Sequence, residues 1–344
     1  GQFILGPIVE ELEQQISVYC ETKYAVGVSS GTDALLISLM AAGIGEGDEV
    51  ITSPFTFFAT AGSIARLGAR PVFVDIEQDT FNINPNLIEK SITDKTRAII
   101  PVHLYGQSAN MDSVLTLAKK NNLVVIEDAA QAIGSEYKGR KAGSMGDYGC
   151  FSFFPTKNLG GFGDGGMVTM SSEDIYNRVK TLRVHGSSIK YYHKVIGGNF
   201  RIDALQAGIV LAKLKYLDQW TEMRRGNAQI YNRLFSERGL TNHLTLPPEI
   251  VPRHVYNQYV IRVKKKRNEL RSFLSKNNIS TEIYYPLPLH LQDCFTFLGY
   301  NKGAFPESEK AANETIALPI FPELAQNQIS HVVEKIDDFF KEIK

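Results

Sequence analysis

Short apolar runs alternate with amphipathic stretches over about residues 25–170 of this chain. The apolar runs are rich in Val and Ile and are bounded by Gly, Pro or Asp, which is typical of buried parallel strands. We predict strands at residues 25–28, 49–53, 70–74, 96–102, 123–127, 148–153 and 166–170, and helices at residues 32–42, 59–67, 85–91 and 111–121. This alternation predicts an α/β fold with a mostly parallel sheet that is covered by helices on both faces.

The pattern changes in the second half of the chain. A long helical pattern over residues 203–235 is rich in Ala, Leu and charge, and we interpret it as a connector between domains. Beyond it we expect strands at residues 256–263 and 280–284, and helices at residues 267–277, 307–315 and 326–343. We therefore predict a large domain over residues 1–235 and a small C-terminal α+β domain over residues 236–344.

Composition and charge exclude several classes of protein. The chain has 37 basic and 37 acidic residues, so its neutral balance gives no reason to expect nucleic acid as a partner. The chain contains no run of 18 apolar residues, so no membrane span is predicted. Its first residues lack the pattern of a secretory signal. The three cysteines, at positions 20, 150 and 294, show no CxxC spacing, which favours reduced thiols in a cytoplasmic protein and no metal site.

Lys157 is the strongest candidate for chemistry in the sequence. A hydrophobic strand pattern runs directly into it, and a glycine-rich loop and a second strand pattern follow. Placing an ammonium group at the end of a buried strand is costly, because the charge loses its water. A lysine in such a place can lose its proton and become a nucleophilic amine. This position therefore indicates Schiff-base chemistry with an aldehyde or ketone.

Asp128 follows another buried strand pattern, at the carboxyl end where open α/β sheets bind their ligands. A carboxylate there could hold a heterocyclic nitrogen in its protonated form, so that a pyridine ring would act as an electron sink. A structural or metal-binding aspartate would occupy the same kind of position. The residue alone does not decide between these interpretations.

A third candidate site lies between the first strand and the first of these helices. Gly31 and Thr32 join the two through small residues, so free N–H groups and the positive end of the helix dipole would face an anion. A plain helix cap would produce the same pattern. Ser152, on the strand before Lys157, could also reach a phosphate, and an aromatic residue in segment 54–60 could stack on a flat cofactor.

Three further features are weaker. Residues 161–166 match GxGxxG, but the segment after them has a strand pattern, which excludes the dinucleotide-binding fingerprint. His103 ends a predicted strand and would either line the pocket or serve as a hydrogen-bonded structural residue. His185 lies just past a helical pattern and is expected at the helix C-terminus.

Together these segments resemble one family, the nucleotide-sugar aminotransferases of the DegT/DnrJ/EryC1/StrS type within the fold-type I pyridoxal-phosphate enzymes. The stretches that carry the resemblance are GPIVEELE, SSGTDALLISLMAAGIGEGDEVITSPFTFFATA, RAIIPVHLYGQSANMD, VVIEDAAQAIGSEYKGRKAGSMGDYGCFSFFPTKNLGGFGDGGMV, LRVHGS and NFRIDALQAGI. They span nearly the whole chain in the family's order.

The resemblance implies roles for individual residues. Lys157 matches the lysine that forms the Schiff base with pyridoxal phosphate, Asp128 the partner of the pyridine nitrogen, and Gln131 the residue that approaches the ring hydroxyl. The phosphate-binding and ring-stacking positions are matched by Gly31, Thr32, Ser152 and Phe57. Asn199 matches an asparagine that reaches the cofactor phosphate of a partner subunit, which implies a homodimer with shared active sites.

The family's chemistry would proceed in two half-reactions. An amino donor, expected to be L-glutamate, leaves the cofactor as pyridoxamine phosphate, and a nucleotide-linked keto-sugar then accepts the amine. Arg201 and the later Tyr284, Tyr285 and His290 resemble substrate-binding positions of members that aminate carbon 3. In some members that act on 3-oxo uronates, a histidine stands where this chain has Tyr284. Arg201 would either contact a substrate anion or pair with Asp203.

We favour a 3-oxo sugar linked to dTDP or UDP, with a 4-oxo sugar as the competing substrate. Two different functions would also fit the same fold. One is a sugar dehydratase that uses pyridoxamine phosphate, and the other is a non-catalytic regulator. Dehydratases of this kind replace the lysine with histidine or add an iron–sulfur cluster, and Lys157 and the scattered cysteines argue against both. The retained Lys157, Asp128 and Gln131 argue against a regulator.

Overall fold

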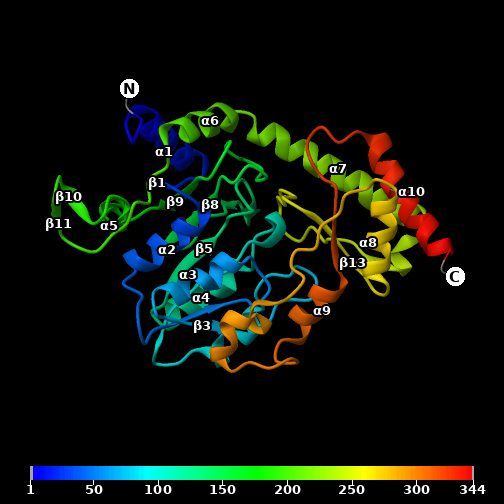
Figure 1. The fold of residues 1–344 in the computed structure, drawn as a ribbon, viewed down its shortest axis with the longest axis horizontal. Coiled ribbons are helices and arrows are strands. Elements are labelled where there is room, and N and C mark those ends of the chain that lie inside the picture. Colours follow the sequence, from blue (N-terminus) through cyan, green and yellow to red (C-terminus); the bar gives the residue numbers. More distant parts are fainter. Residues whose placement is uncertain (1–2, 343–344) are drawn as a thin grey trace.

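The computed structural model describes residues 3–342, and its centre is a seven-stranded sheet in the order β1-β9-β8-β5-β4-β2-β3 (Figure 1). The strands are β1 (Tyr24–Val28), β2 (Glu49–Thr52), β3 (Arg70–Phe73), β4 (Thr96–Ile99), β5 (Val124–Asp128), β8 (Tyr148–Ser152) and β9 (Gly166–Met170). Strand β9 runs antiparallel to β1 and β8, and the other neighbours are parallel. The predicted mostly parallel sheet is confirmed, with its largest boundary difference at β4, which ends at Ile99 instead of residue 102.

Helices pack on both faces of this sheet, as the sequence predicts. They are α1 (Pro7–Tyr19), α2 (Gly31–Ala41), α3 (Phe58–Arg66), α4 (Met111–Lys120), α5 (Glu173–Arg183) and α6 (Ala204–Leu214). The helix predicted at residues 85–91 is wrong. That segment forms two short 3₁₀ turns, η1 (Pro85–Leu87) and η2 (Glu89–Ser91), because it is too short to complete two α-helical turns.

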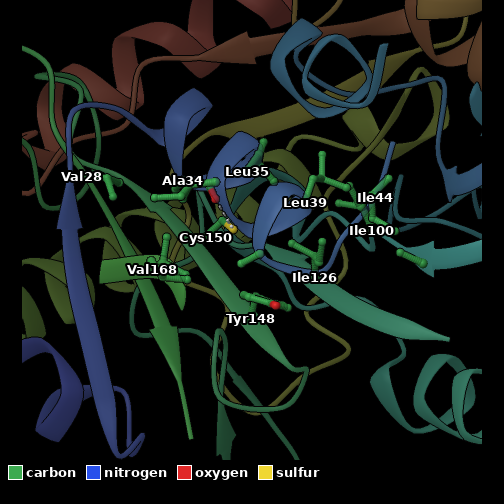
Figure 2. Packing of buried hydrophobic residues seen from close by; sticks show 14 of the residues in the cluster. Val28, Ala34, Leu35, Leu39, Ile44, Ile100, Ile126, Tyr148, Cys150 and Val168 are labelled. Carbon is green, nitrogen blue, oxygen red and sulfur yellow. Dashed lines mark hydrogen bonds between the residues drawn. The ribbon is translucent and has the colours of Figure 1, made fainter. Parts of the chain in front are cut away.

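Helix α2 is buried against the middle of the sheet and fixes one side of the site. Figure 2 shows Leu35 and Leu39 of α2 above Ile126 of β5 and Cys150 of β8. Burying one side chain of this size contributes roughly 1.5–3 kcal/mol to the free energy of folding. The Cys150 thiol also donates to Ala34 O at 3.4 Å. The start of α2 is thus held beside the carboxyl ends of β5 and β8.

The predicted connector is two helices, because the chain breaks at residues 215–216 between α6 and α7 (Leu217–Glu237). Beyond it lies a three-stranded antiparallel sheet with two helices. These elements are β12 (Leu244–Thr245), β13 (Tyr259–Val263), β14 (Thr315–Leu318), α8 (Arg267–Lys276) and α10 (Gln326–Glu342). The final residue of the helix predicted at 326–343 lies outside the described residues. Tyr231 and Phe235 of α7 pack into this second core, and the domain boundary at residue 235 stays a prediction.

The strand predicted at residues 280–284 is wrong, because this segment makes only one isolated bridge, between Glu282 and Ala317. The chain instead turns back toward the large sheet through η5 (Leu289–Leu291), η6 (Asp293–Leu298) and α9 (Pro306–Glu314) (Figure 1). Leu289 donates to Pro54 O at 2.7 Å, and Asp75 accepts from the N–H groups of Glu307 and Ser308 at the start of α9. We call residues 282–291 the return segment.

Two small hairpins and two short 3₁₀ turns complete the described fold. A two-stranded hairpin, β10 (Ser187–Ile189) and β11 (Tyr192–His193), projects from the body of the molecule at the left of Figure 1. A second small hairpin pairs β6 (Glu136–Tyr137) with β7 (Arg140–Lys141), and η3 (Leu104–Gly106) and η4 (Leu240–Asn242) are short 3₁₀ turns. Within residues 3–342, no helix is both long and apolar enough to cross a membrane.

Candidate active site

Asp128 is the last residue of β5 and is buried at the carboxyl edge of the sheet. Its Oδ2 accepts from the Thr60 hydroxyl at 2.8 Å and its Oδ1 from Ala130 N at 3.2 Å. Burial raises the pKa of Asp128, and these two hydrogen bonds and the positive charge of Lys157 oppose the rise. Among residues 3–342, no basic side chain forms an ion pair with this carboxylate within 4.0 Å. The carboxylate would therefore gain stability from a cationic partner.

Lys157 lies in the turn that follows β8, and its backbone N–H donates to Phe154 O at 2.9 Å. Burial lowers the pKa of the Lys157 amine, and the negative charge of Asp128 partly offsets this effect. The amine is thus easier to deprotonate than a lysine in water. The structure places Lys157 and Asp128 at the same edge of the sheet, as the sequence predicts.

The start of α2 meets the end of β8 at the same edge. A Cβ atom on Gly31 would lie 2.7 Å from Ser152 Cβ, so only glycine permits this approach. Ser30 caps the helix by accepting from Asp33 N at 3.0 Å, so the capping interpretation holds for Ser30. The predicted phosphate residues Gly31 and Thr32 are the first two residues of the helix, where N–H groups have no partner within the helix.

Gln131 is fixed from both sides of its amide. Its Oε1 accepts from Tyr105 N at 2.7 Å, and its Nε2 donates to the Tyr285 hydroxyl at 3.2 Å. The ring of Phe57 lies with its centroid 6.2 Å from that of Tyr285 and is 57% exposed. The return segment therefore brings Tyr285 against two of the predicted cofactor residues.

Two predicted residues, Asn199 and Arg201, lie on the segment that pairs with the end of β1, where Arg201 bridges to Val28. Asn199 is exposed, and no side-chain hydrogen bond is found for it in the described part of the chain. The Arg201 Nε atom is buried without a hydrogen-bond partner, and no ion pair joins Arg201 to Asp203 within residues 3–342. The pairing of Arg201 with Asp203 that the sequence allowed is therefore absent.

Three histidines have structural surroundings. His290, predicted to bind substrate, is 2% exposed and pairs through Nε2 with Glu309 Oε1 at 3.1 Å. This burial favours a structural role over contact with a ligand. His103 is buried against Glu127, and His185 follows the end of α5 with φ 61°. The GxGxxG match at residues 161–166 leads into strand β9, so its exclusion as a dinucleotide fingerprint agrees with the structure.

Sequence reasoning missed the residues that hold this site in place. Thr60 lies within the segment noted for its aromatics, and its proximity to Asp128 gives no local pattern. Tyr284 O accepts from the Tyr105 hydroxyl, and the peptide between Tyr284 and Tyr285 is cis. Asn158 and Asn257 form a buried pair beside the lysine turn. No motif marks these contacts, because their partners lie far apart in sequence.

The arrangement fits pyridoxal phosphate on three structural grounds. Within the described residues the buried Asp128 carboxylate has no ion-pair partner, which suits a protonated pyridine nitrogen. Gly31 and Thr32 are the first residues of α2, where N–H groups have no partner within the helix and suit a phosphate. The exposed ring of Phe57 offers a face for stacking. Residues 3–342 contain no cluster of three metal-ligating side chains.

This fold and lysine-bearing strand end define the chain as a fold-type I transferase. The sequence pattern of the DegT/DnrJ/EryC1/StrS aminotransferase family matches residues 1–337, and the chain belongs to this family. A relative from Geobacillus stearothermophilus, named as a pleiotropic regulatory protein, is 53% identical and covers 99% of this chain and 91% of its own. A second, from Streptomyces venezuelae, is named as dTDP-3-amino-3,4,6-trideoxy-alpha-D-glucose transaminase. It is 39% identical and covers 100% of this chain and 90% of its own.

Solved structures of relatives share the whole architecture. The crystal structure of S. venezuelae DesV with a ketimine intermediate has a TM-score of 0.94 at 39% identity, and covers 98% of this chain and 91% of its own. NtdA from Bacillus subtilis, solved with the cofactor pyridoxamine phosphate, has a TM-score of 0.91 at 32% identity, and covers 98% of this chain and 78% of its own. The predicted family, fold, enzyme class and cofactor are thereby confirmed, since this aminotransferase family depends on pyridoxal phosphate.

Proposed function

We propose that this chain transfers an amino group from L-glutamate to a nucleotide-linked keto-sugar, at carbon 3 of a dTDP- or UDP-linked 3-oxo-hexose. The observation that carries the proposal is that the Lys157 amine, whose pKa burial lowers, lies at the same edge of the sheet as the strand-end carboxylate of Asp128. When bound, pyridoxal phosphate supplies an electrophilic carbon and an electron-accepting ring.

The chain's own residues orient the reactants and move the proton. Lys157 would hold the cofactor at its Nζ atom, and its amine, whose pKa burial lowers, would accept and return a proton at the reacting carbon. Asp128 holds the ring nitrogen protonated through its carboxylate. The amide of Gln131, whose orientation is fixed by Tyr105 and Tyr285, would approach the ring hydroxyl.

The phosphate and ring faces are bound by the elements around this pair. The N–H groups at the start of α2, from Gly31 and Thr32, bind the phosphate together with the Ser152 hydroxyl. Phe57 covers one face of the ring. Helix α2 and strand β8 are packed into the core of the sheet, so the phosphate-binding residues are held rigidly.

Support for amination at carbon 3 comes from the relatives. The S. venezuelae relative is named for a 3-amino sugar, and a further relative from Acidithiobacillus ferrooxidans, 42% identical over 98% of this chain and 89% of its own, is named as a 3-aminotransferase. Arg201, whose Nε is buried without a hydrogen-bond partner among residues 3–342, is the candidate for binding the substrate's anionic group. Tyr284 and Tyr285 of the return segment are the candidates for sugar contacts.

We further propose a cytoplasmic homodimer with shared sites. The projecting hairpin and its flank expose large apolar side chains, and Ile196 is 92% exposed. Exposed apolar residues also gather near the starts of α1 and α6, at Phe3, Ile4, Ile8 and Leu205. Clustered apolar exposure of this kind supports a covered face in the working assembly. Asn199 lies between the hairpin and α6, where it could reach a partner's phosphate.

Borohydride trapping tests the central assignment. Protein loaded with pyridoxal phosphate is reduced and digested, and we expect the adduct on the peptide that contains Lys157. Lys157→Ala should lose both the adduct and all turnover. An adduct on a different lysine in wild-type protein, or none, would refute the assignment. The donor and acceptor are then tested with L-glutamate and dTDP- or UDP-linked 3-oxo and 4-oxo sugars.

Shared sites can be tested by mixing two impaired variants. We expect Lys157→Ala to be inactive because it lacks the amine, and Asn199→Ala to have low activity because it retains the cofactor weakly. A mixed dimer would contain one site with both native residues, so co-refolded variants should regain activity. Absence of any recovery, with mixed dimers shown to form, would mean that Asn199 does not act across an interface.

The name of the G. stearothermophilus relative raises the alternative of a regulatory protein. A regulator that has lost catalysis has no need of a buried amine beside a buried carboxylate, and both are present here. Adding L-glutamate to the protein loaded with pyridoxal phosphate separates the two functions. If L-glutamate never converts the bound pyridoxal phosphate to pyridoxamine phosphate, the result would favour a regulatory protein.

A further inference from the structure

A short irregular segment, residues 253–258, precedes β13 and lies against two parts of the site. The N–H of Val255 donates to Gly106 O at 3.0 Å, and the N–H of Asn257 donates to Tyr105 O at 2.9 Å. A Cβ atom on Gly106 would lie 2.7 Å from Val255 Cγ2, so the contact is close. These bonds hold the turn at Tyr105, whose own N–H orients Gln131.

The same segment holds the residue that follows the reactive lysine. Asn158 donates through Nδ2 to Val255 O at 2.9 Å, and Asn257 donates through Nδ2 to Asn158 Oδ1 at 2.9 Å. Because a carbonyl oxygen can only accept, Val255 O fixes which end of the Asn158 amide faces it. The orientation of Asn158 then fixes that of Asn257.

This geometry carries a stability cost. Both side chains are 7% exposed, and the Oδ1 atom of Asn257 is buried without a partner in the described part of the chain. An unpaired buried acceptor costs roughly 1–3 kcal/mol. Native proteins keep few such atoms, so each one asks for a reason beyond packing.

We infer that Asn257 is a positioning residue for Lys157. Its backbone N–H holds the turn that orients Gln131, and its side chain holds Asn158, so one residue keeps the amine and the ring-facing amide in a fixed relation. The inference rests on the proposed function only in taking Lys157 as the reactive amine. Without the Asn257 amide, the lysine turn would gain freedom and the amine would be less firmly buried.

The test measures Lys157 in the cofactor-free protein. Lysines are labelled with acetic anhydride across a series of pH values, and mass spectrometry quantifies the modification of residue 157. Burial lowers the pKa of this amine in the wild type, against the opposing charge of Asp128. In Asn257→Ala we expect the labelling midpoint to move upward by about one pH unit, toward that of a lysine in water.

A matched control is available in the second core. Asn227 is 8% exposed and donates through Nδ2 to Phe321 O at 2.8 Å and Pro322 O at 3.3 Å. Asn227→Ala should lower stability to a similar degree and leave the labelling midpoint of residue 157 at its wild-type value. A midpoint in Asn257→Ala that equals those of wild type and Asn227→Ala would overturn the inference.

Asn158→Ala tests the same link from the other side, and it carries the test if Asn257→Ala does not fold. Because the Asn257 side chain acts only through its hydrogen bond to Asn158, the double variant should shift the midpoint no further than Asn158→Ala alone. Additive shifts would mean that the two residues act separately and would overturn the coupling. The outcome is independent of borohydride trapping, which tests whether Lys157 carries the cofactor at all.

Discussion

Two neighbouring residues at the end of β5, Glu127 and Asp128, are both buried acids with opposite surroundings. The Oε1 of Glu127 accepts from Met145 N and Gly146 N, each at 2.7 Å, and its Oε2 accepts from Gly143 N at 2.9 Å. His103 supplies a fourth bond to Oε2 at 2.8 Å. The acceptor capacity of Glu127 is filled by the protein itself.

His103 must donate in this arrangement. Its Nδ1 accepts from Ala109 N at 3.1 Å, so a neutral ring carries its proton on Nε2, which faces Glu127. Asp128, on the opposite face of the strand, has two donors from the protein. One strand end therefore holds a structural acid, Glu127, and an acid that can still bind a ligand, Asp128. Both are buried, so the number of hydrogen-bond donors around each carboxylate distinguishes them.

Removing the charge of Asp128 should have the largest effect. We expect Asp128→Asn to lower kcat by about 10³-fold, close to 4 kcal/mol, which is the scale for losing one preorganised electrostatic group. Stability in urea should hold or rise, because burial raises the pKa of this carboxyl and the ionised form is costly to fold. Wild-type turnover in this variant would remove Asp128 from the site.

The opposite outcome is expected for Glu127→Gln. The new amide would present N–H groups to backbone N–H donors, so we expect a loss of about 3 kcal/mol in the free energy of unfolding. Turnover per folded molecule should change far less than in Asp128→Asn. Urea denaturation and steady-state kinetics on the same samples make the comparison, and equal activity losses in both variants would break it.

The pH dependence of stability tests the amine beside Asp128. Unfolded lysine keeps its proton up to about pH 10.5, whereas folded Lys157 releases it at a lower pH, because burial lowers its pKa. Between these values the unfolded state binds more protons, so the stability of the cofactor-free protein rises with pH, by at most about 1.4 kcal/mol per pH unit.

Lys157→Met removes this proton and keeps the apolar stem. We expect the variant to be more stable than wild type at neutral pH, with the advantage shrinking as pH approaches 10.5. Urea unfolding at several pH values measures the difference. A constant difference across the range would contradict a lowered pKa for Lys157.

The smallest effect is expected at Thr60. Thr60→Val keeps the shape and removes one of the two donors to Asp128, so the pKa of that carboxyl should rise further. We expect about a tenfold loss of kcat/KM at neutral pH, the equivalent of one hydrogen bond of about 1.4 kcal/mol. The acid limb of the pH–rate profile should move to higher pH, and an unmoved limb would mean that Thr60 does not tune Asp128.

The parts of the site that were predicted from sequence share one property. Asp128 and Lys157 follow strands, and Gly31 begins a helix, so local periodicity places each of them at a strand's carboxyl end. Parallel strands bring those ends to one edge of the sheet. The identities of the chemical groups and their common edge therefore followed from pattern and resemblance.

The parts that failed or were missed depend on long-range packing. Residues 280–284 were predicted as a strand but lead into the return segment, because β14 pairs with β13 in the small sheet. The carboxylate of Asp128 keeps acceptor capacity and that of Glu127 does not, because distant segments place more hydrogen-bond donors around Glu127.

The sequence by itself determined the order of strands and helices, the strand-end lysine and carboxylate, and the family. Only the tertiary structure decided which buried carboxylate has all its acceptor sites occupied and that Tyr285 lies against Gln131. It also decided that residues 253–258 hold the lysine turn. The physical reason is that periodicity reports which face of an element is buried, whereas hydrogen bonds between distant segments leave no periodic trace in the sequence.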